Sequence, residues 1–193
     1  MRSILNKRNL NNKKILLRLD LNVPFENGKI SDSTRIDKIL PTLKFLIQKK
    51  TKIIILSHMG RPKGKIVKGL SLKPICDDLR KKLNLRVKLI TKNIYEIKNK
   101  DFFEKFDEEI LILENIRFYI EEEKNDHKFA EHLASLGDIY VNDAFSCSHR
   151  AHASIYQISK YLPSYSGLQL DLEVAALNKI TTEITKPITC IIG

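Results

Sequence analysis

The sequence predicts an α/β domain of three layers, in which a parallel sheet of about six strands is flanked by helices. Two observations predict this class. Short apolar runs alternate along the chain with segments whose apolar residues recur at helical spacing. Histidine, arginine and acidic or amide residues directly follow several of the apolar runs, as they do where parallel strands end at a ligand-binding edge.

Six apolar runs are the predicted strands. They are too short for independent helices, and most are dominated by isoleucine, leucine and valine, as in strands buried on both faces. The predicted strands are residues 15–23, 53–56, 87–90, 110–113, 139–141 and 188–192.

The segments between these runs show helical periodicity. Ser33 and Thr34 cap the first helix, so Arg35 falls in its first turn, and Pro41 is expected to kink it. Because a helix N-terminus favours anions over cations, an arginine there, close to Asp20, suggests an anion bound between them. Further helices are predicted from a cap at Ser71 to Leu83, around residues 102–106, and over 129–136, 155–162 and 168–185.

The composition is that of a soluble globular protein of one domain, or at most two small ones. The chain has 193 residues, of which 42% are hydrophobic and 30% charged. No apolar run approaches the roughly 20 residues of a membrane span, and the N-terminus has no apolar core of a secretory signal. Three widely spaced cysteines give no disulfide framework. These features predict a cytoplasmic protein.

The net charge of +11 is unevenly distributed. Residues 1–100 carry 26 basic and 7 acidic side chains, whereas the rest of the chain carries 8 and 16. A basic half raises the alternative of a nucleic-acid-binding protein. However, 25 of the 34 basic residues are scattered lysines, with no basic helix stripe, aromatic platform or zinc-finger spacing. The pattern therefore favours a small acidic substrate.

Polar side chains follow four of the predicted strands. In an open parallel sheet, the loops at the carboxyl ends of the strands line the ligand crevice. The planar guanidinium of arginine matches carboxylate and phosphate groups, so the set predicts a small, phosphorylated ligand. The residues are Asp20 and Asn22 after the first strand, His58 and Arg61 after the second, Arg117 after the fourth, and His149 and Arg150 after the fifth.

Each of these side chains also has a purely structural interpretation. Their matching positions after successive strands favour one shared site over separate local contacts. The local alternatives are a salt bridge between Asp20 and Arg35, pairing of Arg117 with Glu114 or Glu121, pairing of Arg150 with Asp143, and a turn capped by His58.

Three other patterns are rejected. Residues 60–65 are one residue short of a phosphate-binding GxxxxGK loop and lack its Ser or Thr. Cys147, His149 and His152 have no partner pair at a zinc-site spacing. Cys147 as a nucleophile with His149 as its base is also disfavoured, because such close neighbours in sequence rarely face each other.

Four motifs together resemble the phosphoglycerate kinase family in order and spacing. They are RLDLNVP followed by Arg35, SHMGRP, LENIRF and NDAFSCSHRAHAS, where the family usually has RVDFNVP, SHLGRP, LEN-RF and NDAFG-AHRAHAS. The resemblance covers the whole chain. Met59 stands where leucine is usual, and Ser146 stands where the family often has glycine, in the loop that presents Arg150.

The resemblance implies a Rossmann-like domain of a glycolytic kinase that transfers a phosphoryl group between 1,3-bisphosphoglycerate and ADP, giving 3-phosphoglycerate and ATP with magnesium. Residues 1–167 are expected to form the phosphoglycerate-binding domain. Residues 168–193 are expected to be the interdomain helix and the start of a nucleotide-binding domain, whose next motif would begin at Gly193. The chain therefore looks cut, and this fragment alone is expected to be inactive.

The resemblance also implies the site residues and partners. Arg35 is the expected catalytic residue, neutralising the transferring phosphoryl group, and no metal is assigned to this chain, since Mg-ATP or Mg-ADP belongs to the missing half. The expected partners are the phosphoglycerates and the nucleotide, without nucleic acid or membrane, and the full-length form is an expected monomer. The alternatives are a phosphate-binding α/β module without activity and a nucleic-acid-binding protein. The expected substrate-binding residues are Asp20, Leu21, Asn22, Arg35, His58, Met59, Gly60, Arg61, Arg117 and Arg150.

Overall fold

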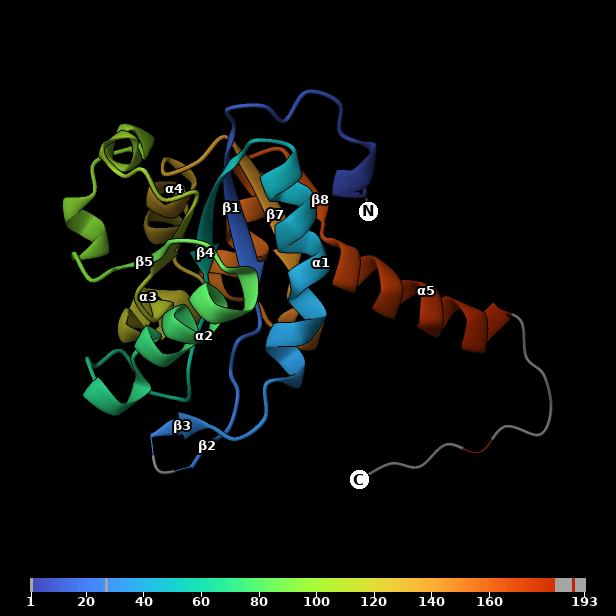
Figure 1. Ribbon diagram of the computed structural model, residues 1–193, viewed down its shortest axis with the longest axis horizontal. Helices are drawn as coiled ribbons and strands as arrows, with labels where there is room; N and C mark the ends of the chain where they lie inside the picture. Colours follow the sequence, from blue (N-terminus) through green and yellow to red (C-terminus); the bar gives the residue numbers. More distant parts are fainter. Residues whose placement is uncertain (1, 27, 183–188, 190–193) are drawn as a thin grey trace.

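The computed structural model describes residues 2–26, 28–182 and 189, and its centre is a six-stranded sheet (Figure 1). The strand order is β5-β6-β4-β1-β7-β8, and every neighbouring pair is parallel. A two-stranded antiparallel hairpin, β2 (Phe25–Glu26) and β3 (Lys29–Ile30), stands apart from this sheet. The six strands are β1 (Lys14–Leu19), β4 (Lys52–Leu56), β5 (Val87–Ile90), β6 (Ile110–Leu113), β7 (Ile139–Asp143) and β8 (Ser164–Ser166).

Helices cover both faces of the sheet, which confirms the predicted three-layer α/β class. The helices are α1 (Thr34–Gln48), α2 (Lys73–Leu83), α3 (Ile120–Glu123), α4 (His127–Ala134) and α5 (Leu168–Thr182). The shorter helical segments are η1 (Ile4–Asn6), η2 (Lys68–Leu70), η3 (Ile94–Glu96), η4 (Lys100–Lys105), η5 (Ile116–Phe118), η6 (Phe145–Cys147), the π-helical η7 (Ala153–Gln157) and η8 (Ile158–Lys160).

Two apolar clusters separate the layers. Because successive side chains of a strand point to opposite faces, Leu17 packs with α1 and α2 on one side, whereas Leu16 packs with η3, η4 and α4 on the other. All residues of β1 and β6 are buried, as expected for parallel strands covered on both faces.

Four predicted strands agree with the structure to within two residues, and two predictions differ. The run 15–23 is too long, because β1 ends at Leu19 and the next residues form the loop that carries the polar side chains. The run 188–192 lies outside the described residues apart from Thr189. The sixth strand is instead β8, which sequence patterning misses because this edge strand is only three residues long and has serine at both ends.

Four predicted helices correspond to α1, α2, α4 and α5, with small changes at their ends. The segment around 102–106 lies in the 3₁₀ segment η4, and the run 155–162 falls mostly in the π-helical η7 and the 3₁₀ segment η8. α1 continues through Pro41 to Gln48. α2 has Leu72 rather than Ser71 at its N-cap, and the Ser71 hydroxyl donates to the Glu114 carboxylate at 2.8 Å. The last helix, α5, is described to Thr182, so the rest of its predicted range lies outside the described residues.

α5 leaves the body of the domain in Figure 1, with only its start against the sheet. Leu170 is buried, whereas Leu172, Leu177 and Ile180 are 64%, 48% and 56% exposed. Among the described helices, none is both long and apolar enough to cross a membrane.

Candidate active site

The chain leaves neighbouring strands toward opposite faces of the sheet at two places. After β1 the chain turns to α1 and after β4 to α2, and both helices pack on one face of the sheet. After β6 it continues to α3 and α4, and after β7 to η7, all on the other face. The two switch points therefore lie between the neighbours β1 and β7 and between the neighbours β4 and β6. Such switch points open crevices at the carboxyl ends of the strands. The sequence places its polar residues at these ends.

The loop after β1 is connected to α1 by an ion pair. Arg35 Nη1 donates to Asp20 Oδ2 at 2.6 Å and to the Asn22 carbonyl at 3.2 Å. The hydroxyl of Ser146, from the loop after β7, donates to the same Asp20 oxygen. The salt bridge considered as an alternative is therefore present, but the Arg35 side chain is 49% exposed, so the pair is worth little as a stabilising contact.

The loop after β4 is held by backbone contacts at Gly60. Its N–H donates to Asn22 Oδ1 at 2.9 Å, and its carbonyl accepts from Arg117 Nη1 at 2.9 Å. Gly60 has φ +61, and a Cβ there would lie 2.8 Å from Leu70 Cδ2. Glycine therefore suits this position both for its conformation and for the close approach of Leu70.

The loop after β6 presents Arg117, which is only 3% exposed. The Asn115 amide supports this loop, since it donates to the carbonyls of Met59 and Leu70 at 2.8 and 2.9 Å and accepts from the Arg117 N–H. Burial lowers the pKa of the Arg117 guanidinium. Its Nε makes no hydrogen bond among the described residues.

The ion-pair partners of Arg117 and Arg150 differ from the local alternatives. Arg117 Nε lies 3.7 Å from Glu123 Oε1, and not at Glu114 or Glu121, the partners considered in the structural alternative. Asp143 is not paired with Arg150: its oxygens accept from Thr42 Oγ1 at 2.5 Å and from the Leu170 N–H at 2.8 Å. Asp143 therefore anchors α5 to α1, and the buried Nε of Arg150 has no hydrogen-bond partner in the described chain.

His58 lies where these loops meet. Its side chain is buried, and burial lowers its pKa to about 2, assisted by the charges of Arg18, Arg117 and Arg150. A carboxylate oxygen of Asp20, a ring nitrogen of His58 and the Sγ of Cys147 all lie within 4.8 Å of one another. Residues from the ends of β1, β4, β6 and β7 thus converge, as the sequence pattern predicted.

Three of the expected substrate-binding residues lie less centrally. Arg61 is exposed, and it makes no hydrogen bond or ion pair with another described residue. Leu21 and Met59 are buried in the apolar core, so only their backbone can face a ligand. The Leu21 N–H itself donates to Ser57 Oγ at 3.2 Å.

The cluster of Asp20, His58 and Cys147 offers metal-type donors but lies in a cationic environment. His58 Nδ1 already has a hydrogen-bond partner, Arg18 Nη2 at 3.1 Å, and the Asp20 carboxylate is already paired with Arg35. A metal ion would face repulsion from both guanidinium groups. The arrangement suits an anion better.

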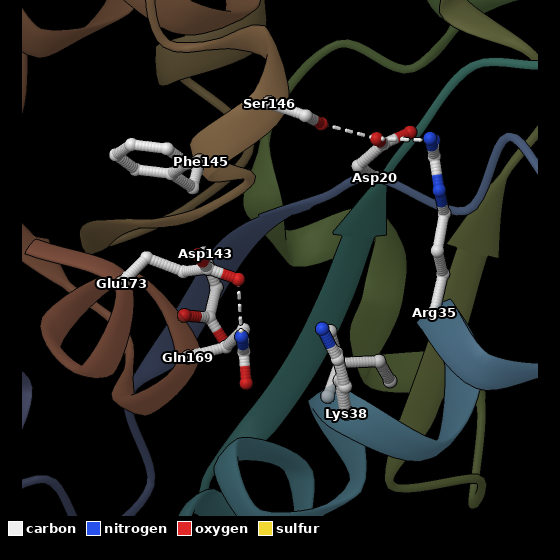
Figure 2. Close-up of a pocket in the computed structure, with 9 residues that line it drawn as sticks. Asp20, Arg35, Lys38, Asp143, Phe145, Ser146, Gln169 and Glu173 are labelled. Atoms are coloured by element: carbon white, nitrogen blue, oxygen red, sulfur yellow. Dashed lines mark hydrogen bonds and ion pairs between the residues drawn. The ribbon is translucent and has the colours of Figure 1, made fainter. Parts of the chain in front are cut away.

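A cavity of about 140 Å³ lies beside Asp20 (Figure 2). Arg35 and Lys38 of α1 line one side, and Gln169 and Glu173 of α5 line the other. A larger cavity of about 510 Å³ opens between the loops after β4, β5 and β6, and none of the expected site residues lines it.

Sequence reasoning missed the polar residues beneath the site. Arg18 and Glu122 are completely buried, and Ser154 joins them by hydrogen bonds. The available signal was Arg18 itself, a charged residue within an apolar strand run, because buried charges need partners.

The fold and this edge define the class: a doubly wound α/β domain with an arginine-lined crevice at its strand ends. The model of the family described as phosphoglycerate kinase matches residues 5–193. The chain therefore belongs to the phosphoglycerate kinase family.

Relatives and solved structures agree with this membership. Phosphoglycerate kinases of Wolbachia pipientis wMel and Orientia tsutsugamushi are 50% and 48% identical over 184 and 181 residues, covering 95% and 94% of this chain but 46% and 45% of those proteins. The structure of phosphoglycerate kinase from Coxiella burnetii matches 96% of this chain and 46% of its own, with 39% identity and a TM-score of 0.85. The chain thus spans about half the length of the curated relatives it matches.

Proposed function

We propose that the protein catalyses reversible phosphoryl transfer between 1,3-bisphosphoglycerate and ADP, giving 3-phosphoglycerate and ATP, and that this chain supplies the phosphoglycerate site. The convergence of His58, Arg117 and Arg150 at one crevice carries the proposal. The buried Nε atoms of both arginines have no hydrogen-bond partner among the described residues. Because an unpaired buried donor is costly, an anion accepting from them would stabilise the site.

The proposed roles follow from position. Arg61, Arg117 and Arg150 hold the distal phosphate together with His58, while Asp20 and Asn22 orient the hydroxyl and carboxylate end. The backbone of Leu21, Met59 and Gly60 completes the substrate-binding surface. Arg61 is exposed, so it can turn toward the ligand at little cost.

Arg35 is the proposed catalytic residue. Phosphoryl transfer depends mainly on positioning and on stabilisation of charge at the moving group. A half-exposed guanidinium, held by Asp20 at the rim, is suited to meet a phosphoryl group arriving from outside this domain.

The nucleotide site is proposed to lie outside this chain. The relatives are about twice as long, which supports a second domain in the whole protein. Residues 1–167 are proposed to form the phosphoglycerate domain, and residues 168–193 the interdomain helix and the start of the nucleotide-binding domain. Mg-ATP or Mg-ADP would be carried by the other half, and domain closure would then exclude water. A glycolytic reaction supports a cytoplasmic location, and the whole protein is proposed to be a monomer.

Calorimetric titration of the 193-residue chain with 3-phosphoglycerate, paired with a coupled ATP assay, tests this proposal. Binding without turnover is expected. Turnover by the chain alone would contradict the division of labour, and absent binding would contradict the site. Equal affinity for inorganic phosphate would favour the phosphate-binding module, whereas binding to an oligonucleotide that falls steeply with salt would favour the nucleic-acid alternative.

A further inference from the structure

A buried ionic network lies directly beneath the proposed site. Arg18, the last residue but one of β1, is completely buried. Its Nε donates to Ser154 Oγ at 2.9 Å, its Nη1 donates to the Leu19 carbonyl, and its Nη2 lies 3.1 Å from His58 Nδ1. A buried guanidinium is costly without partners, so this residue needs an explanation beyond packing.

Glu122 of α3 supplies the opposite charge. It is completely buried, and its Oε1 and Oε2 accept from the Ser154 hydroxyl and N–H at 2.6 and 2.9 Å. Burial raises the pKa of this carboxyl, and the charge of Arg18 opposes that rise. Because Ser154 Oγ accepts from Arg18, its single proton goes to Glu122, and both carboxylate oxygens are acceptors.

The direction of these hydrogen bonds fixes the protonation of His58. Arginine only donates, so His58 Nδ1 must accept from Arg18 Nη2, and the ring proton lies on Nε2. The reversed ring orientation would place a C–H against the guanidinium. A doubly protonated ring would direct its Nδ1–H at Arg18.

We propose that Arg18, backed by Ser154 and Glu122, is a positioning residue that holds His58 as the neutral Nε2–H tautomer, so that the site offers an anion a directed N–H. The charged and titratable groups near His58 are Arg18, Arg117, Arg150, His152, Asp20 and Cys147. The positive charges among them agree with the hydrogen bonds in keeping the ring neutral. The inference rests on the proposed function for the anion's identity, but the tautomer can be tested without a ligand.

Long-range ¹H–¹⁵N correlation spectra of the 193-residue chain measure the tautomer directly. The Nε2–H form is expected for His58, with no titration between pH 5 and 8. A proton on Nδ1, or titration within that range, would overturn the proposal. This result is independent of whether 3-phosphoglycerate binds, so failure of the proposed function remains distinguishable.

The double variant Arg18→Met/Glu122→Leu tests the cause. Replacing both members of a buried pair by apolar residues often leaves a protein folded, whereas removing one does not. His58 is expected to populate both tautomers, because no donor then holds Nδ1 as an acceptor, while burial still keeps the ring neutral.

The matched control is Arg80→Met/Asp77→Asn. It removes an exposed ion pair on α2, joined at 2.8 Å, and leaves Arg18 and Glu122 in place. An unchanged His58 spectrum in the folded double variant would overturn the positioning role. Should the double variant not fold, Arg18→Gln/Glu122→Gln replaces the charged pair with amides that can donate or accept, and a His58 that stays entirely in the Nε2–H form there would also overturn it.

Discussion

Asp20 and Arg35 form a 2.6 Å ion pair between the loop after β1 and the first turn of α1. Asp20 also accepts from Ser146, so the carboxylate is held from two sides. Arg35 is held only at its tip, and half of its side chain faces solvent. This asymmetry makes Asp20 a fixed support and Arg35 a group that can be redirected toward a phosphoryl group.

Arg35→Ala should therefore lower kcat of the whole protein by about a hundredfold or more, as expected for loss of a charge-stabilising donor. Steady-state kinetics measure this, and Lys44→Ala, an exposed lysine on the same helix, is the control. A variant in which only KM changed would rule out the catalytic assignment.

Arg61→Ala and Arg117→Ala should each weaken 3-phosphoglycerate binding by roughly 1.5–3 kcal/mol, the value of a hydrogen bond to a charged group. Their effects on stability should differ. Arg61 is exposed, so its variant should keep the melting temperature, whereas Arg117→Ala leaves the Gly60 carbonyl without its donor and should melt lower. Calorimetry and thermal melts measure the two properties, and equal melting temperatures would contradict the structural role of Arg117.

Much of the fold could be predicted because the signals are local. β6, Ile110–Leu113, is an unbroken apolar run, and Arg35 follows a recognisable helix start. β8 gave no such signal, because its place in the sheet is set by pairing with β7 rather than by its own hydrophobicity.

In the site, too, the residues with a local signal could be predicted and the contacts between distant residues could not. Residues such as Asp20 and Arg117 could be predicted from their places after strands. The contact of Arg18 with Ser154 joins residues 136 positions apart, and the pairing of Arg117 with Glu123 depends on how η5 and α3 pack. Neither relationship leaves a periodic pattern in the sequence.

Gly64→Ala should destabilise the loop that carries Arg61. Gly64 has φ +75, and a Cβ would lie 2.7 Å from Ile120 Cβ and 3.1 Å from its Cα, which the backbone cannot easily relieve. Gly69→Ala is the control, because nothing lies within 4 Å of its Cβ position. Urea unfolding should show a loss of about 1 kcal/mol or more for Gly64→Ala. Equal midpoints for the two variants would refute the steric argument.

Stability should fall as the pH drops below about 6.5. Burial lowers the pKa of His152 to about 4 and that of His58 to about 2. The unfolded chain therefore binds more protons than the folded chain between these values and about 6.5, so the free energy of unfolding rises with pH there.

Each such histidine contributes up to about 1.4 kcal/mol per pH unit within its range. Urea unfolding at a series of pH values measures the slope. His152→Gln should make it shallower between about pH 4 and 6.5. A slope identical to that of the unmodified chain would mean that His152 is protonated in the folded state.

The exposed side of α5 should make this chain associate at high concentration. Leu172, Leu177 and Ile180 are about half or more exposed, and exposed apolar patches of this kind promote contacts between molecules. Burying each such side chain recovers up to roughly 1.5–3 kcal/mol, enough for weak association when several act together.

Sedimentation velocity over a concentration series should show larger species that Leu172→Gln/Leu177→Gln removes. Leu5→Gln, which changes a leucine that is 52% exposed outside α5, is the control. Association equally reduced by this control would place the contact elsewhere on the surface.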